Sequence, residues 1–202
     1  MARHPGAGMK AARRQLPAPF VVNVARLGRR PGALMPLREQ RISPTRIGLE
    51  LVAIPADGAV DLDLRVESVS EGVLVSGVVS ARTAGECARC LQPLTGDIEV
   101  ELTELFAYPD STTDATTEDD EMGRVVDDAV DLEQAIVDAV GLALPLSPLC
   151  DPDCPGLCPD CGVVLSTAEP GHHHDKIDPR WAKLAGMLEP QDDAGPSDDG
   201  ER

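Results

Sequence analysis

The spacing of the cysteines constrains this chain more than any other feature of its sequence. Four of the six stand within twelve residues, in Cys150-Asp-Pro-Asp-Cys154-Pro-Gly-Leu-Cys158-Pro-Asp-Cys161, and the other two form Cys87-Ala-Arg-Cys90. The N-terminal region does not have the pattern of a secretory signal, because its apolar patch at 16–24 is broken by proline and flanked by arginines. We therefore expect a cytoplasmic protein whose thiols bind a metal rather than form disulfides.

The end of the cysteine cluster, Cys158-Pro-Asp-Cys161-Gly162, has the form of a zinc knuckle. Two intervening residues let both thiolates reach one ion, and a glycine after the second cysteine permits the tight turn. Zn²⁺ takes four ligands in a tetrahedron, at about 2.3 Å for sulfur. We predict one structural zinc ion, bound by the four clustered thiolates of Cys150, Cys154, Cys158 and Cys161.

Two alternative ligand sets stay open. In the first, Cys87 and Cys90 join the Cys158–Cys161 knuckle, so that distant segments make one ribbon-like site. In the second, His172 or His174 replaces one of the two cysteines that precede the knuckle. The competing interpretation of the histidine run is a solvated surface segment.

Charge is divided unequally along the chain. Residues 1–46 carry ten basic side chains against one acid, whereas the remainder carries 34 acids and 8 basic groups, which gives the net charge of −17. A basic segment on an acidic body is typical of a protein that meets an anionic surface such as RNA or a ribosomal particle. Arg26, Arg29 and Arg30 flank a Leu27-Gly28 turn and are our candidates for partner binding. The alternative is that the basic segment folds onto its own acidic body.

Composition argues against several function classes. Only four aromatic residues occur, too few for the stacking platforms that grip RNA bases. No apolar run approaches the roughly 20 residues that span a bilayer, and the basic segment has no clean amphipathic helix, so we expect no membrane partner. Apart from His4, every histidine stands in one run, so no nucleophile–base arrangement is apparent. We expect neither an enzyme nor a small-molecule substrate.

Alternation of apolar and polar residues at period two predicts a sheet with one solvated face. The expected strands are short and joined by tight turns, which favours an antiparallel meander over a parallel sheet. They cover 20–24, 48–55, 60–66, 73–79 and 98–105.

One core helix is expected at 131–145. Asp131 and Gln134 suit a capping box, apolar residues such as Ile136 and Val140 recur at helical spacing, and Pro145 ends the pattern. We therefore predict an α+β fold, in which an antiparallel β meander packs with a helix. A C-terminal Cys-rich zinc knuckle and a short helix at 178–188 complete it.

The predicted organisation has six parts. Nine acids and one arginine between 110 and 131 are typical of a solvated spacer, and the two ends of the chain lack apolar patterning. The parts are a disordered basic arm at 1–18, a mainly β core at 19–108, an acidic disordered linker at 109–130, the core helix at 131–145, the Cys-rich knuckle and C-terminal helix at 146–188, and a disordered tail at 189–202.

Several motifs, taken in order, resemble those of the YceD-type family of large ribosomal RNA subunit accumulation proteins, formerly a domain of unknown function. The segments Leu27–Gly32 and Gly171–His174 are similar to its high-GC Gram-positive branch. The resemblance covers roughly residues 19–188. The motifs are Cys87-Ala-Arg-Cys-Leu91, the acidic linker, the helix that ends in Leu142-Ala-Leu-Pro145, the knuckle from Cys154 to Gly162, and Asp178-Pro-Arg-Trp-Ala-Lys-Leu184.

The resemblance implies a cytosolic, non-enzymatic factor needed for normal levels of 23S ribosomal RNA, acting in rRNA processing or large-subunit assembly. Its partners would be ribosomal precursor particles or rRNA, or an rRNA maturation protein. The alternative is a zinc-binding adaptor that docks an rRNA maturation enzyme without contacting RNA. The acidic body favours this alternative, because it repels phosphate.

The resemblance also bears on individual residues. Some family members keep the Cys-x-Arg-Cys pair but lack the later knuckle, which favours a self-contained C-terminal zinc site. Many relatives carry a further Cys-x-Cys near the position of His172–His174, which favours a histidine ligand here. Arg89 stands between the paired cysteines, at an expected outward-facing hairpin tip, and we predict that it binds a partner. Its competing role is a salt bridge to the protein's own acids.

Overall fold

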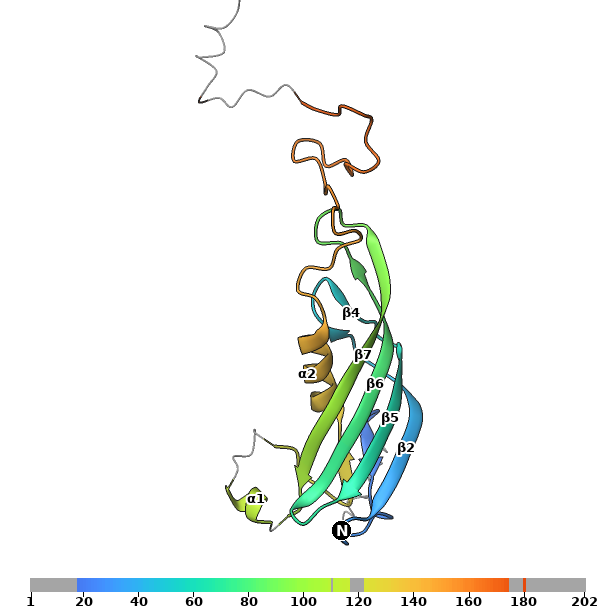
Figure 1. Ribbon diagram of the computed structural model, residues 1–202, viewed down its shortest axis with the longest axis vertical. Helices are drawn as coiled ribbons and strands as arrows, with labels where there is room; N and C mark the ends of the chain where they lie inside the picture. Colours follow the sequence, from blue (N-terminus) through green and yellow to red (C-terminus); the bar gives the residue numbers. More distant parts are fainter. Residues whose placement is uncertain (1–17, 110, 117–121, 175–179, 181–202) are drawn as a thin grey trace, which may run out of the picture. The chain divides into compact units, whose positions relative to one another are not determined.

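The computed structural model describes residues 18–109, 111–116, 122–174 and 180, which fall into two compact units within residues 1–154 and 155–202 (Figure 1). The Cys-rich region predicted at 146–188 is divided between them, with Cys150 and Cys154 in the first unit. Most of the basic arm, the C-terminal helix expected at 178–188 and the acidic tail lie outside the described residues, apart from residue 18 and Arg180.

The first unit is built on a six-stranded sheet whose strand pairs are antiparallel. Its central strand is β6 (Gly72–Glu86), which pairs over its whole length with β7 (Pro93–Ala107). The other side of β6 pairs with β5 (Ala59–Ser68) and, nearer the end of β6, with β4 (Val52–Ile54). The edges beyond them are β2 (Leu34–Ile42) and β3 (Ile47–Gly48). The consecutive hairpins β5–β6–β7 confirm the predicted meander.

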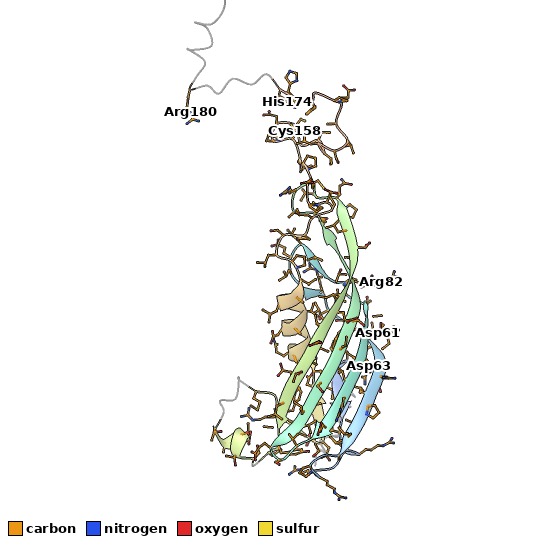
Figure 2. All side chains as sticks on the ribbon, in the orientation of Figure 1. Asp61, Asp63, Arg82, Cys158, His174 and Arg180 are labelled. Carbon is orange, nitrogen blue, oxygen red and sulfur yellow. The ribbon has the colours of Figure 1, made fainter. Side chains whose placement is uncertain are left out.

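The sheet has one apolar and one polar face, as period two requires. In β5, Val60, Leu62 and Leu64 are buried, whereas Asp61 and Asp63 between them are exposed. Asp61, Asp63 and Arg82 on the polar face point away from the helix at 133–143 (Figure 2). The alternation therefore predicts correctly which side of the sheet faces the core.

The apolar face is covered by α2 (Glu133–Ala143) and by a two-stranded ribbon of β1 (Val21–Asn23) and β8 (Ala129–Asp131) (Figure 1). Ile136, Val140 and Leu132 are fully buried against the sheet. Burying an aliphatic side chain of this size stabilises a fold by about 1.5–3 kcal/mol. The packing of a helix on an antiparallel meander is thus confirmed.

The strand predictions differ from the structure in several places. Strands β6 and β7 extend well beyond the short strands predicted at 73–79 and 98–105, to 15 residues each. The segment predicted as one strand at 48–55 is the hairpin β3–β4, because Leu49 N–H donates to Val52 O at 2.9 Å and closes a turn. Strand β2 was not predicted at all. It is an edge strand in which only Leu37 is buried, so it lacks the alternation that marks the inner strands.

The disordered spacer predicted at 109–130 is wrong for the described part of that range. The range contains a short helix, α1 (Thr112–Thr116). Asp114 of this helix forms an ion pair of 2.5 Å with Arg124. Val125 N–H donates to Ala107 O at 2.9 Å, and β8 follows. Val125 and Val130 of this segment are buried in the core. The free energy gained by burying them outweighs the tendency of the nearby acids to keep the segment in solvent.

Helix α2 begins two residues later than predicted, and the capping box is wrong. Asp131 belongs to β8, and its carboxylate accepts the Glu133 N–H at 3.0 Å, while buried Leu132 occupies the N-cap position. The Gln134 amide donates forward to Asp138 at 2.8 Å instead of bonding back to the start of the helix.

Among the described residues, none of the helices has the length and apolar character needed to cross a bilayer.

Candidate metal centres and charged surfaces

The β6–β7 hairpin ends in a tight turn formed by Cys87-Ala-Arg-Cys-Leu91-Gln92. Cys87 N–H donates to Gln92 O at 2.9 Å, and Leu91 N–H donates to Cys87 O at 2.9 Å. The turn requires a φ of 57° at Leu91, a left-handed conformation that costs a residue with a side chain roughly 1–2 kcal/mol. It leaves the Cys87 and Cys90 side chains buried.

After α2 the chain returns to this turn and brings two more thiols to it. Ala88 N–H donates to Pro148 O at 2.8 Å, and Cys150 and Cys154 follow. All four sulfur atoms lie within 4.8 Å of one another, and Cys150 is the exposed member. We call Cys87, Cys90, Cys150 and Cys154 the hairpin cluster.

Two sulfur–sulfur separations in the hairpin cluster match those in a tetrahedron of metal ligands. Cys87 Sγ lies 3.8 Å from Cys154 Sγ, and Cys90 Sγ lies 3.6 Å from Cys150 Sγ. A disulfide requires about 2.05 Å, so these are free thiols. Four thiolates that each stand about 2.3 Å from a zinc ion are about 3.8 Å apart. The cluster could therefore hold a metal ion.

The thiols of the hairpin cluster differ in acidity. Burial raises the pKa of Cys87, but backbone N–H groups of Cys90, Cys150 and Arg89 outweigh burial and lower that pKa to about 6. Side-chain hydrogen bonds with Cys154 and Cys90 raise the pKa of Cys150 to about 12. The pKa values of Cys87 and Cys150 are thus shifted in opposite directions within one cluster, and a bound cation would favour the thiolate form of its ligands.

Arg89 is turned onto the protein's own backbone. Its guanidinium donates to Cys154 O at 2.9 Å and to Pro152 O at 3.5 Å, and its backbone N–H donates to Cys87 Sγ at 3.5 Å. Neither acceptor of the side chain is a carboxylate, so these contacts are not the salt bridge considered from the sequence. Partner binding by Arg89 stays a prediction, whereas the contacts show that it links the two halves of the hairpin cluster.

The second unit repeats the same backbone turn at its own cysteine pair. Cys158 N–H donates to Val163 O at 2.8 Å, and Gly162 N–H donates to Cys158 O at 2.9 Å. Gly162, which corresponds to Leu91, has a φ of 73°. N–H groups of Cys161 and Asp160 lower the pKa of Cys158 to about 6. Both Cys-x-x-Cys segments thus form one kind of turn, with backbone N–H groups directed at the first sulfur.

Two histidines complete a group of four ligands in the second unit. A turn in which His172 N–H donates to Glu169 O at 3.0 Å folds the histidine run back. His172 Nε2 lies 3.3 Å from Cys161 Sγ and 3.1 Å from His174 Nε2. His173 is instead directed at Gly171 O, 2.7 Å from its Nδ1. We call Cys158, Cys161, His172 and His174, whose ligand atoms lie within 4.8 Å of one another, the knuckle cluster.

The four cysteines of the predicted zinc site fall into two different groups. Cys150 and Cys154 stand with the early pair, while Cys158 and Cys161 stand with His172 and His174. The single site of four cysteines stays a prediction, and the alternative histidine ligands lie where a metal could use them. The pairing of Cys87 and Cys90 with Cys150 and Cys154 was missed. The one sequence signal for it was the number of candidate ligands, which suffices for two complete sets.

The candidate arginines form a separate surface of the first unit. Arg26, Arg29 and Arg30 are exposed on the segment before β2, and Arg29 Cζ lies 5.0 Å from the ring centre of Tyr108. Tyr108 follows β7, at the opposite end of the hairpin from the cysteines. Fifteen residues of antiparallel strand span about 50 Å. These arginines and Arg89 therefore do not belong to one binding surface.

Other basic residues of the segment 1–46 contact groups of the protein itself. Arg38 pairs with Asp63 at 2.9 Å across β2 and β5, and Arg41 pairs with Glu39 at 2.5 Å. Arg46 donates to the carbonyl oxygens of Leu49 and Glu50. Of these residues only Arg38 pairs with an acid of the body, whereas the partner of Arg41 lies within the segment itself and Arg46 contacts backbone carbonyls. Both interpretations of the basic segment therefore stay predictions.

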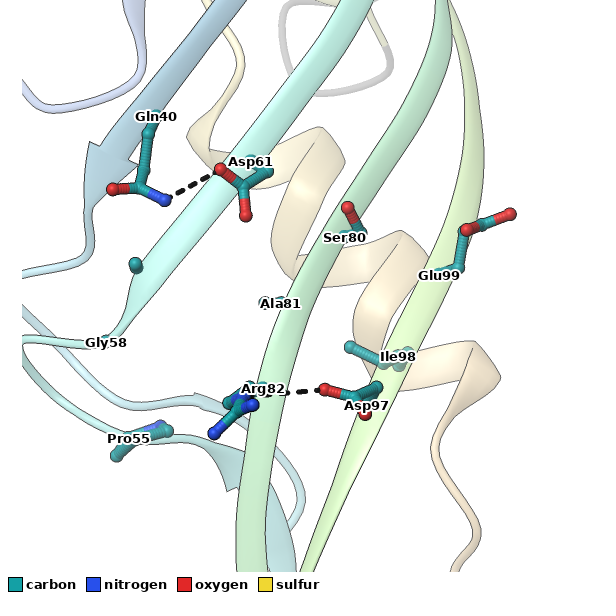
Figure 3. Close-up of a pocket in the computed structure, with 11 residues that line it drawn as sticks. Gln40, Pro55, Gly58, Asp61, Ser80, Ala81, Arg82, Asp97, Ile98 and Glu99 are labelled. Carbon is teal, nitrogen blue, oxygen red and sulfur yellow. Dashed lines mark hydrogen bonds and ion pairs between the residues drawn. The ribbon is translucent and has the colours of Figure 1, made fainter.

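A shallow hollow lies on the polar face of the sheet (Figure 3). Gln40 donates to Asp61 at 2.8 Å, and Arg82 stands 3.8 Å from Asp97. Ser80 is the only hydroxyl among the lining residues, and none of them is a histidine or cysteine. The hollow is therefore lined mainly by the exposed polar side chains of the sheet.

Comparison with known proteins places these features in a family. Residues 75–188 match the family described as "Large ribosomal RNA subunit accumulation protein YceD". Uncharacterized proteins of Mycobacterium tuberculosis and Mycobacterium bovis are each 64% identical over 193 residues, covering 96% of this chain and 91% of the relative. A Mycobacterium leprae protein is 54% identical over 189 residues, covering 94% and 87%. No solved structure matches the chain.

Proposed function

Because the chain belongs to the YceD family of large ribosomal RNA subunit accumulation proteins, we propose that it supports the accumulation and processing of 23S rRNA. In this role it is a non-enzymatic factor of the cytoplasm that acts during assembly of the large ribosomal subunit. The observation that carries the proposal is the family match, which spans most of β6, all of β7 and α2, and both ligand clusters.

The knuckle cluster is the zinc site that this function includes. Its N–N and S–N distances of 3.1 and 3.3 Å are close to the values of about 3.3 and 3.6 Å expected around tetrahedral zinc. Two thiolates and two imidazoles fill all four positions, so the ion would be structural rather than catalytic. In this set His172 and His174 stand in place of Cys150 and Cys154, which belong to the first unit.

The exposed arginines provide the surface for an anionic partner. Arg26, Arg29 and Arg30 stand within five residues, and the stacking of Arg29 on Tyr108 holds one of them against the fold. A ribosomal precursor particle or rRNA presents phosphates that such a group can contact. The partner would then bind at the arginine end of the sheet, away from the hairpin cluster.

A second candidate function is an adaptor that docks an rRNA maturation protein without touching RNA. The polar face of the sheet favours it, because Asp61, Asp97 and Glu99 gather around the shallow hollow (Figure 3). With three carboxylates against the single arginine Arg82, the lining of the hollow is net negative, which favours contact with a basic protein surface over contact with phosphate.

The two functions differ in how salt affects binding of rRNA. Changing Arg26, Arg29 and Arg30 together to Ala should reduce the slope of log affinity against log salt by about two units, since each phosphate contact with single-stranded RNA contributes about 0.7. A matched control changes Arg38, Arg65 and Arg82 to Ala, because it removes the same charge from the polar face of the sheet. Cells that carry the first variant should contain less 23S rRNA than cells that carry the control. If the wild-type protein does not bind rRNA even at low salt, the adaptor function is supported.

A further inference from the structure

We propose that the hairpin cluster is a second metal centre, a tetrathiolate zinc site formed by Cys87, Cys90, Cys150 and Cys154. It lies within the first unit and is complete without any residue of the second. The chain then carries two ions instead of the single one that its sequence suggests. This inference does not depend on the role in rRNA accumulation.

The geometry of the sulfur atoms is the first support. Separations of 3.8 and 3.6 Å, between Cys87 and Cys154 and between Cys90 and Cys150, match two opposite edges of a zinc tetrahedron, about 3.8 Å each. Thiols hydrogen-bond only weakly to one another, so thiol contacts alone give little reason for three of the four to be buried together. A divalent ion with tetrahedral preference and affinity for sulfur supplies that reason.

The backbone of the hairpin tip is the second support. Both hydrogen bonds of the Cys158–Gly162 turn recur in the turn from Cys87 to Gln92, at 2.9 Å each. Leu91 takes the left-handed conformation that glycine takes at position 162. A strained residue of this kind persists where its surroundings fix the backbone, as ligation of Cys87 and Cys90 by one ion would do.

The position of the cluster indicates what the ion does. The segment that follows α2 exposes Leu146 and Leu149, so it buries little apolar surface at the hairpin tip. Its described links to the tip are the Ala88 and Arg89 hydrogen bonds and the sulfur contacts. Four protein ligands leave no open coordination position, so the ion joins the segment to the hairpin and performs no chemistry.

The test is the zinc content of the full-length chain, purified under reducing conditions. The wild type should hold two ions per chain. The double variant Cys158→Ser/Cys161→Ser should keep one, and Cys87→Ser/Cys90→Ser should keep the other. His173→Ala is the matched control for the second unit and should keep both ions, because His173 is directed at the Gly171 carbonyl.

Replacement of zinc by Co²⁺ identifies the ligands. In Cys158→Ser/Cys161→Ser, cobalt should show a sulfur-to-metal charge-transfer absorption roughly twice as strong as in Cys87→Ser/Cys90→Ser, since four thiolates are bound instead of two. The proposal is overturned if Cys158→Ser/Cys161→Ser binds neither zinc nor cobalt. This variant leaves the β unit intact, so the test holds even if Cys87→Ser/Cys90→Ser fails to fold.

Discussion

The hairpin cluster and the knuckle cluster use one turn in two different settings. In the hairpin cluster the turn closes a hairpin of two 15-residue strands, and three of the four thiols of the cluster are buried. In the second, only Cys158 is buried, and two of the ligands are histidines. The first turn therefore rests on a sheet that has its own apolar core, whereas the second stands in a unit without a strand or helix among its described residues.

This difference predicts what an ion bound at each cluster would stabilise. The sheet of the first unit buries a large set of aliphatic side chains, so its folding does not need a metal. The second unit resembles a small metal-bound domain, in which the free energy of binding is the free energy of folding. A Cys-x-x-Cys motif thus gives the local turn, and the surrounding chain decides whether the ion adds to a fold or creates it.

Removal of zinc should produce the largest effect. In isolated zinc fingers the metal contributes about 10–16 kcal/mol, so a strong chelator should abolish amide protection throughout 155–174. In the first unit protection should fall only at 87–92 and 146–154, while β5, β6 and β7 keep theirs. Hydrogen exchange of the full chain with and without chelator measures both. Loss of protection in the central strands would contradict the comparison.

Substitution of Arg89 should produce an intermediate effect in the hairpin cluster alone. Arg89→Ala removes the hydrogen bond of 2.9 Å to Cys154 O, and loss of a residue that positions metal ligands typically costs about 10–100-fold in affinity. Competition with a chromophoric chelator measures this for each ion. Arg82→Ala is the control, because Arg82 is an exposed arginine on the same hairpin.

The Arg89 variant also separates two roles of that side chain. If Arg89 positions the cluster, Arg89→Ala lowers the zinc affinity of the hairpin cluster alone. The cellular level of 23S rRNA then falls only in proportion to the loss of folded protein. If Arg89 binds a partner, both zinc affinities stay at the wild-type value while 23S rRNA falls. The second result would restore the interpretation made from the sequence.

Substitution of Leu91 and Gly162, which have a left-handed backbone in the two cysteine turns, should produce the smallest effects. The two substitutions should change stability in opposite directions. Leu91→Gly relieves an unfavourable φ of 57° at a half-exposed side chain and should stabilise the first unit by up to about 1 kcal/mol. Gly162→Ala introduces the same strain in the second unit and should destabilise its metal-bound form by about 1 kcal/mol. Thermal unfolding of the zinc-bound chain, followed separately for the two units, checks both signs. Equal signs would show that the two turns are not equivalent.

The sequence alone determined the features that depend on neighbouring residues. Period-two alternation located β5, β6 and β7, and the apolar stripe with Ile136 and Val140 located α2. The Cys158-to-Gly162 turn is equally local, because two intervening residues and a glycine define it. Edge strand β2 could not be predicted in this way, because Leu37 is its only buried residue and its sequence therefore lacks the alternation.

Only the tertiary structure decided which ligands share a site. Cys90 and Cys150 are 60 residues apart, and they meet because β6 and β7 carry one pair to the end of the sheet and α2 returns the other to it. Cys154 and Cys158 are only four residues apart, yet they belong to different units. Sequence distance measures the length of chain between two thiols, whereas a metal requires proximity in space, and the packing of strands and helix determines that proximity.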